Sequence, residues 1–390
     1  MRPRTNLSSK AKPMLVNDPQ ARIREEAARL DPRLIEMRRD IHSHPELAFE
    51  EVGTAGIVAA ELTRMGISHR TGVERTGVLG AIKAGRPGPT LALRADMDAL
   101  PIHEETGLAF ASKLDGRMHA CGHDIHTVTL LGVAEVLNGM RENLSGRIVL
   151  IFPPAEDVLE GAPAKIADDA AEGVDMAIGF HNHPNQPVGS FSFVGAPSLA
   201  ASDHFDITLR GKSGHAAHPY AAVDPIMGAA HLITQLETLV SREQKPLHPC
   251  VVTAGMFQAG TTYNIIPERV HLKGTVRSLQ AKARDVAEAE MHLTAIIDSR
   301  RMVGSLVNDD RVLEPAIASV RAHFGEVVHE GQPFMGAEDF AEKVPSFQPG
   351  IGAGAPGRDD RLHNADYQPD ERCIALGVPA PSRIAVDMLA

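Results

Sequence analysis

The 390-residue sequence has few cysteines, no long apolar run and no excess of positive charge. Its three cysteines, Cys121, Cys250 and Cys373, are an odd and sparse set, which argues against a disulfide-stabilised extracellular fold. No apolar run reaches the length of a membrane-spanning helix, so we expect no membrane partner. The formal net charge of −11 is not offset by a basic stripe, so we also expect no nucleic-acid partner.

The beginning of the chain has no feature of a secretion signal. Residues 1–13 are basic and polar but lack the apolar stretch that such a signal needs. We expect residues 1–17 to form a disordered tail, and the reduced thiols to indicate a cytoplasmic protein. The length is sufficient for two domains, and no internal repeat or low-complexity tract is evident.

In the first half of the chain, predicted strands alternate with predicted helices. The helices cover residues 18–43, 54–65 and 125–140, and the strands cover residues 78–83, 90–94, 147–152 and 176–180. This alternation predicts an α/β fold with a mostly parallel sheet covered by helices.

The pattern changes after Pro197 to that of a compact α+β unit. The predicted strands there cover residues 202–210, 251–257 and 270–277, and the predicted helices cover residues 224–241 and 281–298. The chain then returns with a helix at 313–324, a strand at 347–352 and a last helix from residue 370. We therefore expect a lid or dimerisation domain, residues 198–310, inserted into a catalytic domain formed by residues 18–197 and 311–390.

The densest group of chemically reactive side chains lies in residues 119–126, just ahead of an apolar helical run. Cys121, His123, Asp124 and His126 combine a thiol, imidazoles and a carboxylate, a donor set typical of transition-metal sites. A single cysteine is more often a small buried residue, but His123 only two positions from Cys121 favours a metal. A metal held by side chains that leave room for water indicates hydrolysis.

Further polar groups follow the predicted strands. They are Asp96, Asp98, Glu156, Asp157, His181 and His183. In open α/β sheets, ligands bind in the crevice beyond the carboxyl ends of the strands. Each group also has a simpler explanation, because the acids could cap turns or helices and the histidines could be solvated loop residues. Their shared position after predicted strands favours a common site. His363, in the loop after the last predicted strand, is a further candidate for it.

Several short segments occur in a characteristic order between residues 34 and 378. They are RADMDALP at 94–101, HACGHDIH at 119–126, PAED at 154–157, GFH at 179–181, GHAA at 214–217, YNIIP at 263–267, GTVR at 274–277, MGAEDF at 335–340 and LH at 362–363. This ordered set strongly resembles the aminoacylase/carboxypeptidase class of metal-dependent amidohydrolases. Within that class it is similar to the branch of hippurate hydrolases, N-acyl-amino-acid deacylases and auxin-conjugate hydrolases.

The resemblance implies a role for each matching side chain. The implied metal ligands are Cys121, His123, Asp157, His181 and His363. Glu156 is implied as the general base and Asp98 as the carboxylate that orients a ligand or the base. His215 is implied to polarise the scissile carbonyl, often in the active site of the other subunit. Asn264 and Arg277 are implied to hold the substrate carboxylate or carbonyl.

The implied reaction is hydrolysis of the amide between an acyl group and an amino acid or related amine. One or two manganese, zinc, cobalt or nickel ions are implied, in a homodimer or homotetramer. Two alternatives stay open: a dipeptidase or carboxypeptidase, and a non-catalytic metal-binding descendant. The second alternative draws on two departures from the family pattern. Asp157 stands where a glutamate is usual, and residues 300–310 are short, so the lid lacks its fourth strand or pairs it differently.

Overall fold

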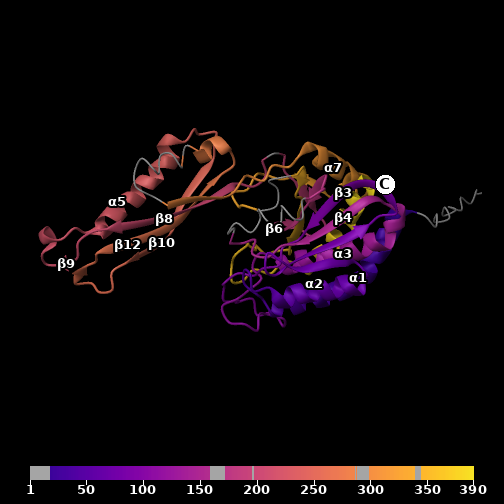
Figure 1. The fold of residues 1–390 in the computed structure, drawn as a ribbon, viewed down its shortest axis with the longest axis horizontal. Coiled ribbons are helices and arrows are strands. Elements are labelled where there is room, and N and C mark those ends of the chain that lie inside the picture. Colours follow the sequence, from indigo (N-terminus) through magenta and orange to yellow (C-terminus); the bar gives the residue numbers. More distant parts are fainter. Residues whose placement is uncertain (1–17, 159–171, 196, 286, 288–297, 339–343) are drawn as a thin grey trace, which may run out of the picture.

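The computed structural model describes residues 18–158, 172–195, 197–285, 287, 298–338 and 344–390. The tail predicted at residues 1–17 lies outside the described residues. Figure 1 shows a larger body that contains both ends of the described chain, and a smaller body with α5, β8, β10 and β12 that extends away from it. Among the described helices, none combines the length and apolarity that crossing a bilayer requires.

The larger body is built on a six-stranded sheet in the order β1-β2-β4-β3-β5-β15. Its strands are β1 (Ser68–Val73), β2 (Gly77–Lys83), β3 (Arg86–Arg94), β4 (Ser145–Phe152), β5 (Met176–Ile178) and β15 (Ser346–Phe347). β4, β3, β5 and β15 are parallel, whereas β2 pairs antiparallel with β1 and β4. The prediction of an α/β fold with a mostly parallel sheet is confirmed.

Helices pack against this sheet and bury the main apolar core. They are α1 (Pro19–Ser43), α2 (Val52–Arg64), α3 (His123–Met140), α7 (Asp310–Phe324), α8 (Ile374–Gly377) and α9 (Pro379–Met388), with short 3-10 turns η1 (Arg141–Asn143) and η4 (Glu371–Cys373). α1 begins after Asp18, whose side chain accepts a hydrogen bond from the backbone N–H of Gln20. α3 is buried on nearly every side, and it begins two residues earlier than predicted, which places His123 in its first turn.

A second, smaller sheet has the order β14-β7-β16-β6. Its strands are β6 (His181–Pro187), β7 (Phe191–Phe193), β14 (Val328–Glu330) and β16 (Gly350–Gly354). The single strand predicted at 347–352 is therefore two strands, β15 and β16, which join different sheets. β6 was not predicted, because its polar and proline-rich sequence lacks an apolar alternation.

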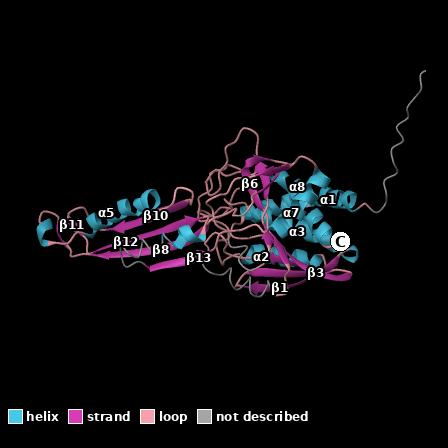
Figure 2. Cartoon of the chain, turned by 90° about the horizontal axis from the view of Figure 1, so that it is seen from above, coloured by secondary structure: helices cyan, strands magenta, loops and turns pink. Residues whose placement is uncertain are grey.

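The smaller body is a four-stranded antiparallel sheet in the order β10-β12-β8-β13, covered on one face by α5. Its elements are β8 (Ala201–Arg210), β9 (Gly214–His215), η2 (Pro219–Ala221), α5 (Pro225–Thr238), η3 (Leu239–Glu243), β10 (Cys250–Ala259), β11 (Ile265–Ile266), β12 (Arg269–Ser278) and β13 (Asp298–Val303). Figure 2 shows α5 lying along one side of this sheet.

The fourth strand of this sheet is present. β13 pairs antiparallel with β8, so of the two expected alternatives, a missing fourth strand or a different pairing of it, the first was wrong. Its Asp-Ser-Arg-Arg start is polar and largely exposed, which hid the strand from a search for apolar alternation. The helix predicted to end at Asp298 does not reach that residue, and most of its second half lies outside the described residues.

Candidate metal centre

The chemically reactive side chains lie where parallel strands of the main sheet end. β3 leads to Asp96 and Asp98, β4 leads to Glu156 and Asp157, and β5 is followed by His181 at the start of β6. Because β3, β4 and β5 are parallel, their carboxyl ends meet at the same edge. The structure thus brings these side chains together at one edge of the sheet.

The turn before α3 depends on Gly122. Its φ is 95°, in the left-handed region that favours glycine. A Cβ atom at this position would lie 2.3 Å from Oδ1 of Asn182. Glycine therefore allows the segment with Cys121 and His123 to approach β6, which carries His181.

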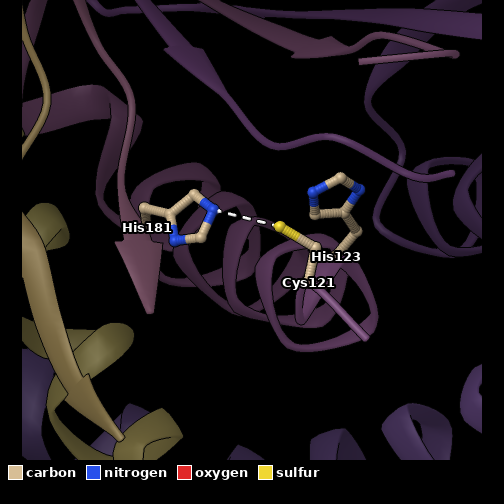
Figure 3. Close-up of side chains that lie close together, drawn as sticks. All are labelled: Cys121, His123 and His181. Atoms are coloured by element: carbon tan, nitrogen blue, oxygen red, sulfur yellow. Dashed lines mark hydrogen bonds between the residues drawn. The ribbon is translucent and has the colours of Figure 1, made fainter. Parts of the chain in front are cut away.

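The five predicted metal ligands form one cluster. Figure 3 shows the Cys121 thiol directed at the imidazole of His181, 3.5 Å from its Nε2 atom, with His123 beside it. Ligand atoms of Cys121, His123 and His181 lie within 4.8 Å of one another, and so do those of Cys121, Asp157 and His363. Cys121 belongs to both groups of three, so the two groups are contiguous.

Two atoms of this cluster are buried without a hydrogen-bond partner. They are Nε2 of His123 and Oδ2 of Asp157. An unpaired buried polar group costs about 1–3 kcal/mol, and native proteins rarely leave one. Bound cations would satisfy these atoms, and thiolate, imidazole and carboxylate are the donors that transition metals prefer. The residues present therefore fit a divalent transition metal.

Burial also sets the protonation of two of these ligands. It lowers the pKa of His181 well below the usual value, so the imidazole is neutral and keeps a lone pair for a metal. Burial raises the pKa of Cys121 to about 12, so this thiol holds its proton at neutral pH unless a cation stabilises the thiolate. The affinity of the cluster for a metal should therefore rise with pH.

Asp98 supports two members of the cluster at once. Its Oδ1 lies 3.1 Å from Nδ1 of His123, and its Oδ2 accepts a hydrogen bond from the backbone N–H of Asp157 at 3.0 Å. Carboxylates that bond the outer nitrogen of a ligand histidine fix its tautomer and ring orientation. Asp98 therefore contacts the ring of one predicted ligand and the backbone of another.

His126 lies next to the cluster, but both of its ring nitrogens already have partners. Nδ1 is 2.6 Å from Oδ1 of Asp96, and Nε2 accepts a hydrogen bond from the backbone N–H of Asn182 at 3.0 Å. Asp96, His123 and His126 could also surround a cation. Because the hydrogen bonds of His126 are short and complete, we regard His126 and Asp96 as residues that orient the cluster rather than ligands.

Sequence reasoning missed two buried networks around the cluster. In the first, Arg94 lies 2.9 Å from Asp96 and 2.6 Å from Glu338. Burial alone would raise the pKa of Asp96, but His123, His126 and Arg94 hold it well below the usual range. The sequence feature that could have revealed this network is the position of Arg94 at the end of a predicted strand, two residues before Asp96.

In the second network, Asp124 in the first turn of α3 binds two residues of α1. Nε of Arg38 lies 2.7 Å from its carboxylate, and Nδ1 of His42 lies 2.8 Å from it. Burial would lower the pKa of His42, but its hydrogen bonds to Asp124 and Glu104 raise it. His42 precedes Asp124 by 82 positions, so no local pattern could reveal this contact.

Glu156 lies at the edge of the cluster and is 5% exposed. Its Oε2 is 3.7 Å from Nε2 of His123, the unpartnered ligand atom. A water molecule near that atom could be bonded by this carboxylate. Arg277 in β12 is close enough to interact with Glu156: burial lowers the pKa of Arg277, and the charge of Glu156 opposes this shift. Arg277 of the smaller body thus lies within electrostatic range of Glu156.

His215 and Asn264 lie at the opposite end of the lid. His215 in β9 pairs with Ile265 in β11, and the backbone carbonyl of Asn264 accepts a hydrogen bond from Ala216. Figures 1 and 2 show β9 and β11 at the end of the lid that points away from the larger body. The structure does not bring these two residues to the metal centre of the same chain.

Residues 92–385 match the family model described as peptidase family M20/M25/M40. This match covers well over half of the sequence. The chain belongs to this peptidase family. It is a metal-dependent hydrolase, which confirms the resemblance to the aminoacylase/carboxypeptidase class.

Individual relatives extend the similarity over almost the entire chain. The N-acetylcysteine deacetylase of Bacillus subtilis is 38% identical over 92% of this chain and 97% of its own. Thermostable carboxypeptidase 1 of Saccharolobus solfataricus is 34% identical over 94% of this chain and 98% of its own. A crystal structure of a Bacillus subtilis dinuclear metal binding peptidase from the M20 family aligns with a TM-score of 0.76 and 35% identity, over 93% and 99% of the two chains.

Proposed function

We propose that this M20-family hydrolase cleaves the amide bond between an acyl group and an amino acid or related amine, with Glu156 as the general base. The observation that carries this proposal is the buried Glu156 carboxylate beside the unpartnered ligand atom of His123. The name of the N-acetylcysteine deacetylase, with its 38% identity, supports an N-acyl amino acid as the substrate.

Five side chains are proposed to hold the metal: Cys121, His123, Asp157, His181 and His363. A divalent metal bound there supplies a water molecule with a pKa of about 7 and polarises the scissile carbonyl. Two ions are favoured, because the ligands form two groups of three with Cys121 in common, and a related structure is named as dinuclear. The donor set suits manganese, zinc, cobalt or nickel alike.

Glu156 is proposed to move the proton in this reaction. Its carboxylate takes a proton from the attacking water and delivers it to the leaving amine. Asp98 keeps His123 and Asp157 in place while this occurs. Positioned proton transfer of this kind contributes about 10²–10⁴ in rate.

The lid, residues 198–310, is proposed to complete the active site from the other subunit of a homodimer, or of a tetramer that contains such dimers. His215 would then stabilise the oxyanion, with Asn264 beside it, in a catalytic domain formed by residues 18–197 and 311–390. Arg277 would bind the substrate carboxylate in its own chain, where its charge interacts with that of Glu156. We propose a cytoplasmic location, which the three free cysteines support.

The test is hydrolysis of matched substrates by protein loaded with manganese or zinc. N-acetyl and N-benzoyl amino acids should be cleaved faster than dipeptides of the same amino acids. The Glu156→Gln variant should lose about 10²–10⁴ in kcat while it retains its metal, measured by elemental analysis. Full activity in that variant would remove Glu156 from the mechanism.

A dipeptidase or carboxypeptidase is the second candidate, favoured by the 34% identity with a thermostable carboxypeptidase. Faster cleavage of dipeptides, or of carboxyl-terminal residues, would decide for it. No turnover of any amide by the metal-loaded protein would instead favour a non-catalytic metal-binding protein.

A further inference from the structure

The lid contains a polar cavity that is separate from the metal centre. Its volume is about 360 Å³, and its lining residues are Thr208, Gln258, Ala259, Gly260, Arg269 and His271. Arg269 begins β12 and Arg277 lies near its end, so these two residues are about 26 Å apart along an extended strand, and the cavity lies at the end of β12 remote from Arg277. No carboxylate lines the cavity, whereas four of its side chains can donate hydrogen bonds.

The cavity is built on neighbouring rows of the sheet. In one row, His271 stands opposite Gln258 of β10 and Thr208 of β8. In the next row along β12, Arg269 stands directly opposite Arg210 of β8. Residues opposite each other in a ladder project from the same face, so Arg210 lies at the edge of this cavity. Gly260 follows β10 and leaves space because it has no side chain.

The positive charges of Arg269 and Arg210 repel each other. Like charges directly opposite each other in an antiparallel sheet are destabilising. Within the described residues, no carboxylate lies at ion-pair distance from either guanidinium. Asp206 is close by in β8, but its carboxylate binds His271 at 2.6 Å and Lys273 at 3.1 Å. An anion bound between Arg269 and Arg210 would remove their repulsion.

We propose that this cavity binds a small molecule through an oxyanion, a carboxylate or a phosphate. The planar guanidinium of Arg269 offers paired N–H donors that match the oxygens of either group, and Arg210 offers a second pair. The hydroxyl of Thr208 and the amide of Gln258 add donors from the flanking strands. The ligand class follows from the two guanidinium groups and from the lack of a carboxylate among the lining residues.

Calorimetric titration of the metal-loaded protein tests the site, with inorganic phosphate and succinate as probes at constant ionic strength. Wild-type protein should bind at least one probe saturably, and Arg269→Gln/Arg210→Gln should bind it at least about tenfold more weakly. Arg242→Gln/Lys245→Gln is the matched control. It removes two exposed positive charges from the same lid, at positions that do not belong to the sheet face lined by Thr208, Gln258 and His271. The control should change the affinity less than twofold. Equal affinity in both double variants, or no binding by the wild type, overturns the proposal.

Phosphate could also bind at the metal centre, so the titration is repeated with His123→Ala. Binding that survives in this variant and is lost on removal of both arginines belongs to the lid, whereas binding lost with His123 overturns the proposal. The stronger of the two probes identifies the anion as phosphate or carboxylate. In crystals soaked with selenate, the selenium anomalous signal should lie between Arg269 and Arg210. Binding is measured without catalysis, so this test can succeed or fail independently of the proposed function.

Discussion

The buried carboxylate of Glu51 accepts a hydrogen bond from the backbone N–H of Ala155, at 2.9 Å. Ala155 has a φ of 59°, an unusual conformation for a residue other than glycine, and it directly precedes Glu156. Glu51 also accepts hydrogen bonds from the hydroxyl of Thr76 and the backbone N–H of Phe49. One carboxylate thus holds the turn that presents the proposed general base.

Glu51→Gln should therefore lower both stability and activity. The amide oxygen can accept from the two backbone N–H groups, but the Thr76 hydroxyl then has to accept from the amide N–H, and the hydrogen bonds to a carboxylate, each worth about 1.5–3 kcal/mol, become weaker neutral ones. We expect this loss in the free energy of unfolding from denaturant titration, together with a lower kcat. Glu50→Gln is the matched control, because Glu50 is 56% exposed and only pairs with Arg117, a contact worth about 0–1 kcal/mol. Equal effects of the two changes would contradict the proposed role of Glu51.

Gly122→Ala should lower both the stability of the protein and its affinity for metal. The comparison with a second glycine shows how much of this loss comes from backbone strain and how much from a steric clash at the start of α3. The new Cβ would meet the side chain of Asn182 at 2.3 Å, in addition to the strain at a φ of 95°. Gly107→Ala is the control, since Gly107 has a φ of 68° and nothing within 4 Å. Strain alone costs about 1–2 kcal/mol, so the Gly107 variant should lose that much stability and keep its metal affinity. The Gly122 variant should lose more stability and also bind metal more weakly, as measured by competition with a chelator.

Asp98→Asn should weaken metal binding without unfolding the protein. One carboxylate now serves both Nδ1 of His123 and the backbone N–H of Asp157, and an amide cannot accept from both sides. Loss of such an outer partner typically costs about 10–100-fold in metal affinity. Chelator competition measures this, with Asp115→Asn, at a side chain 90% exposed, as control. An unchanged affinity would show that His123 does not need Asp98.

The sequence located the five proposed metal ligands more readily than the contacts that support them. Cys121, His123, Asp157, His181 and His363 were each found because they follow a predicted strand or belong to a recognisable segment. Strand ends in a parallel sheet converge by topology, so local sequence is sufficient to place such residues near one another.

The supporting residues could not be found in the same way. Glu51 meets Ala155 across 104 positions, and its own neighbourhood reads as an ordinary helix start. β13 was missed because an exposed edge strand needs no apolar alternation, and β1 (Ser68–Val73) was missed for the same reason. Contacts that depend on tertiary packing leave little trace in local pattern.

The position of His215 at the far end of the lid leads to a prediction about subunits. Within one chain, His215 is not near Glu156, so a role in catalysis requires the lid of a second copy to reach this metal centre. Glu156→Gln and His215→Ala should therefore each be inactive alone, for different reasons. If the subunits exchange, a mixed dimer contains one site with an intact Glu156 from one chain and an intact His215 from the other.

Mixing the two inactive variants should restore activity. With random exchange in a dimer, half of the dimers are mixed and each has one complete site, so recovery should approach about one quarter of wild-type activity. A Glu156→Gln/His215→Ala double variant mixed with Glu156→Gln is the control and should recover nothing, because no site then contains both groups. Exchange is verified by native mass spectrometry of the mixture. If mixed dimers form and the activity stays at the level of the single variants, His215 does not act on the metal centre of the other chain.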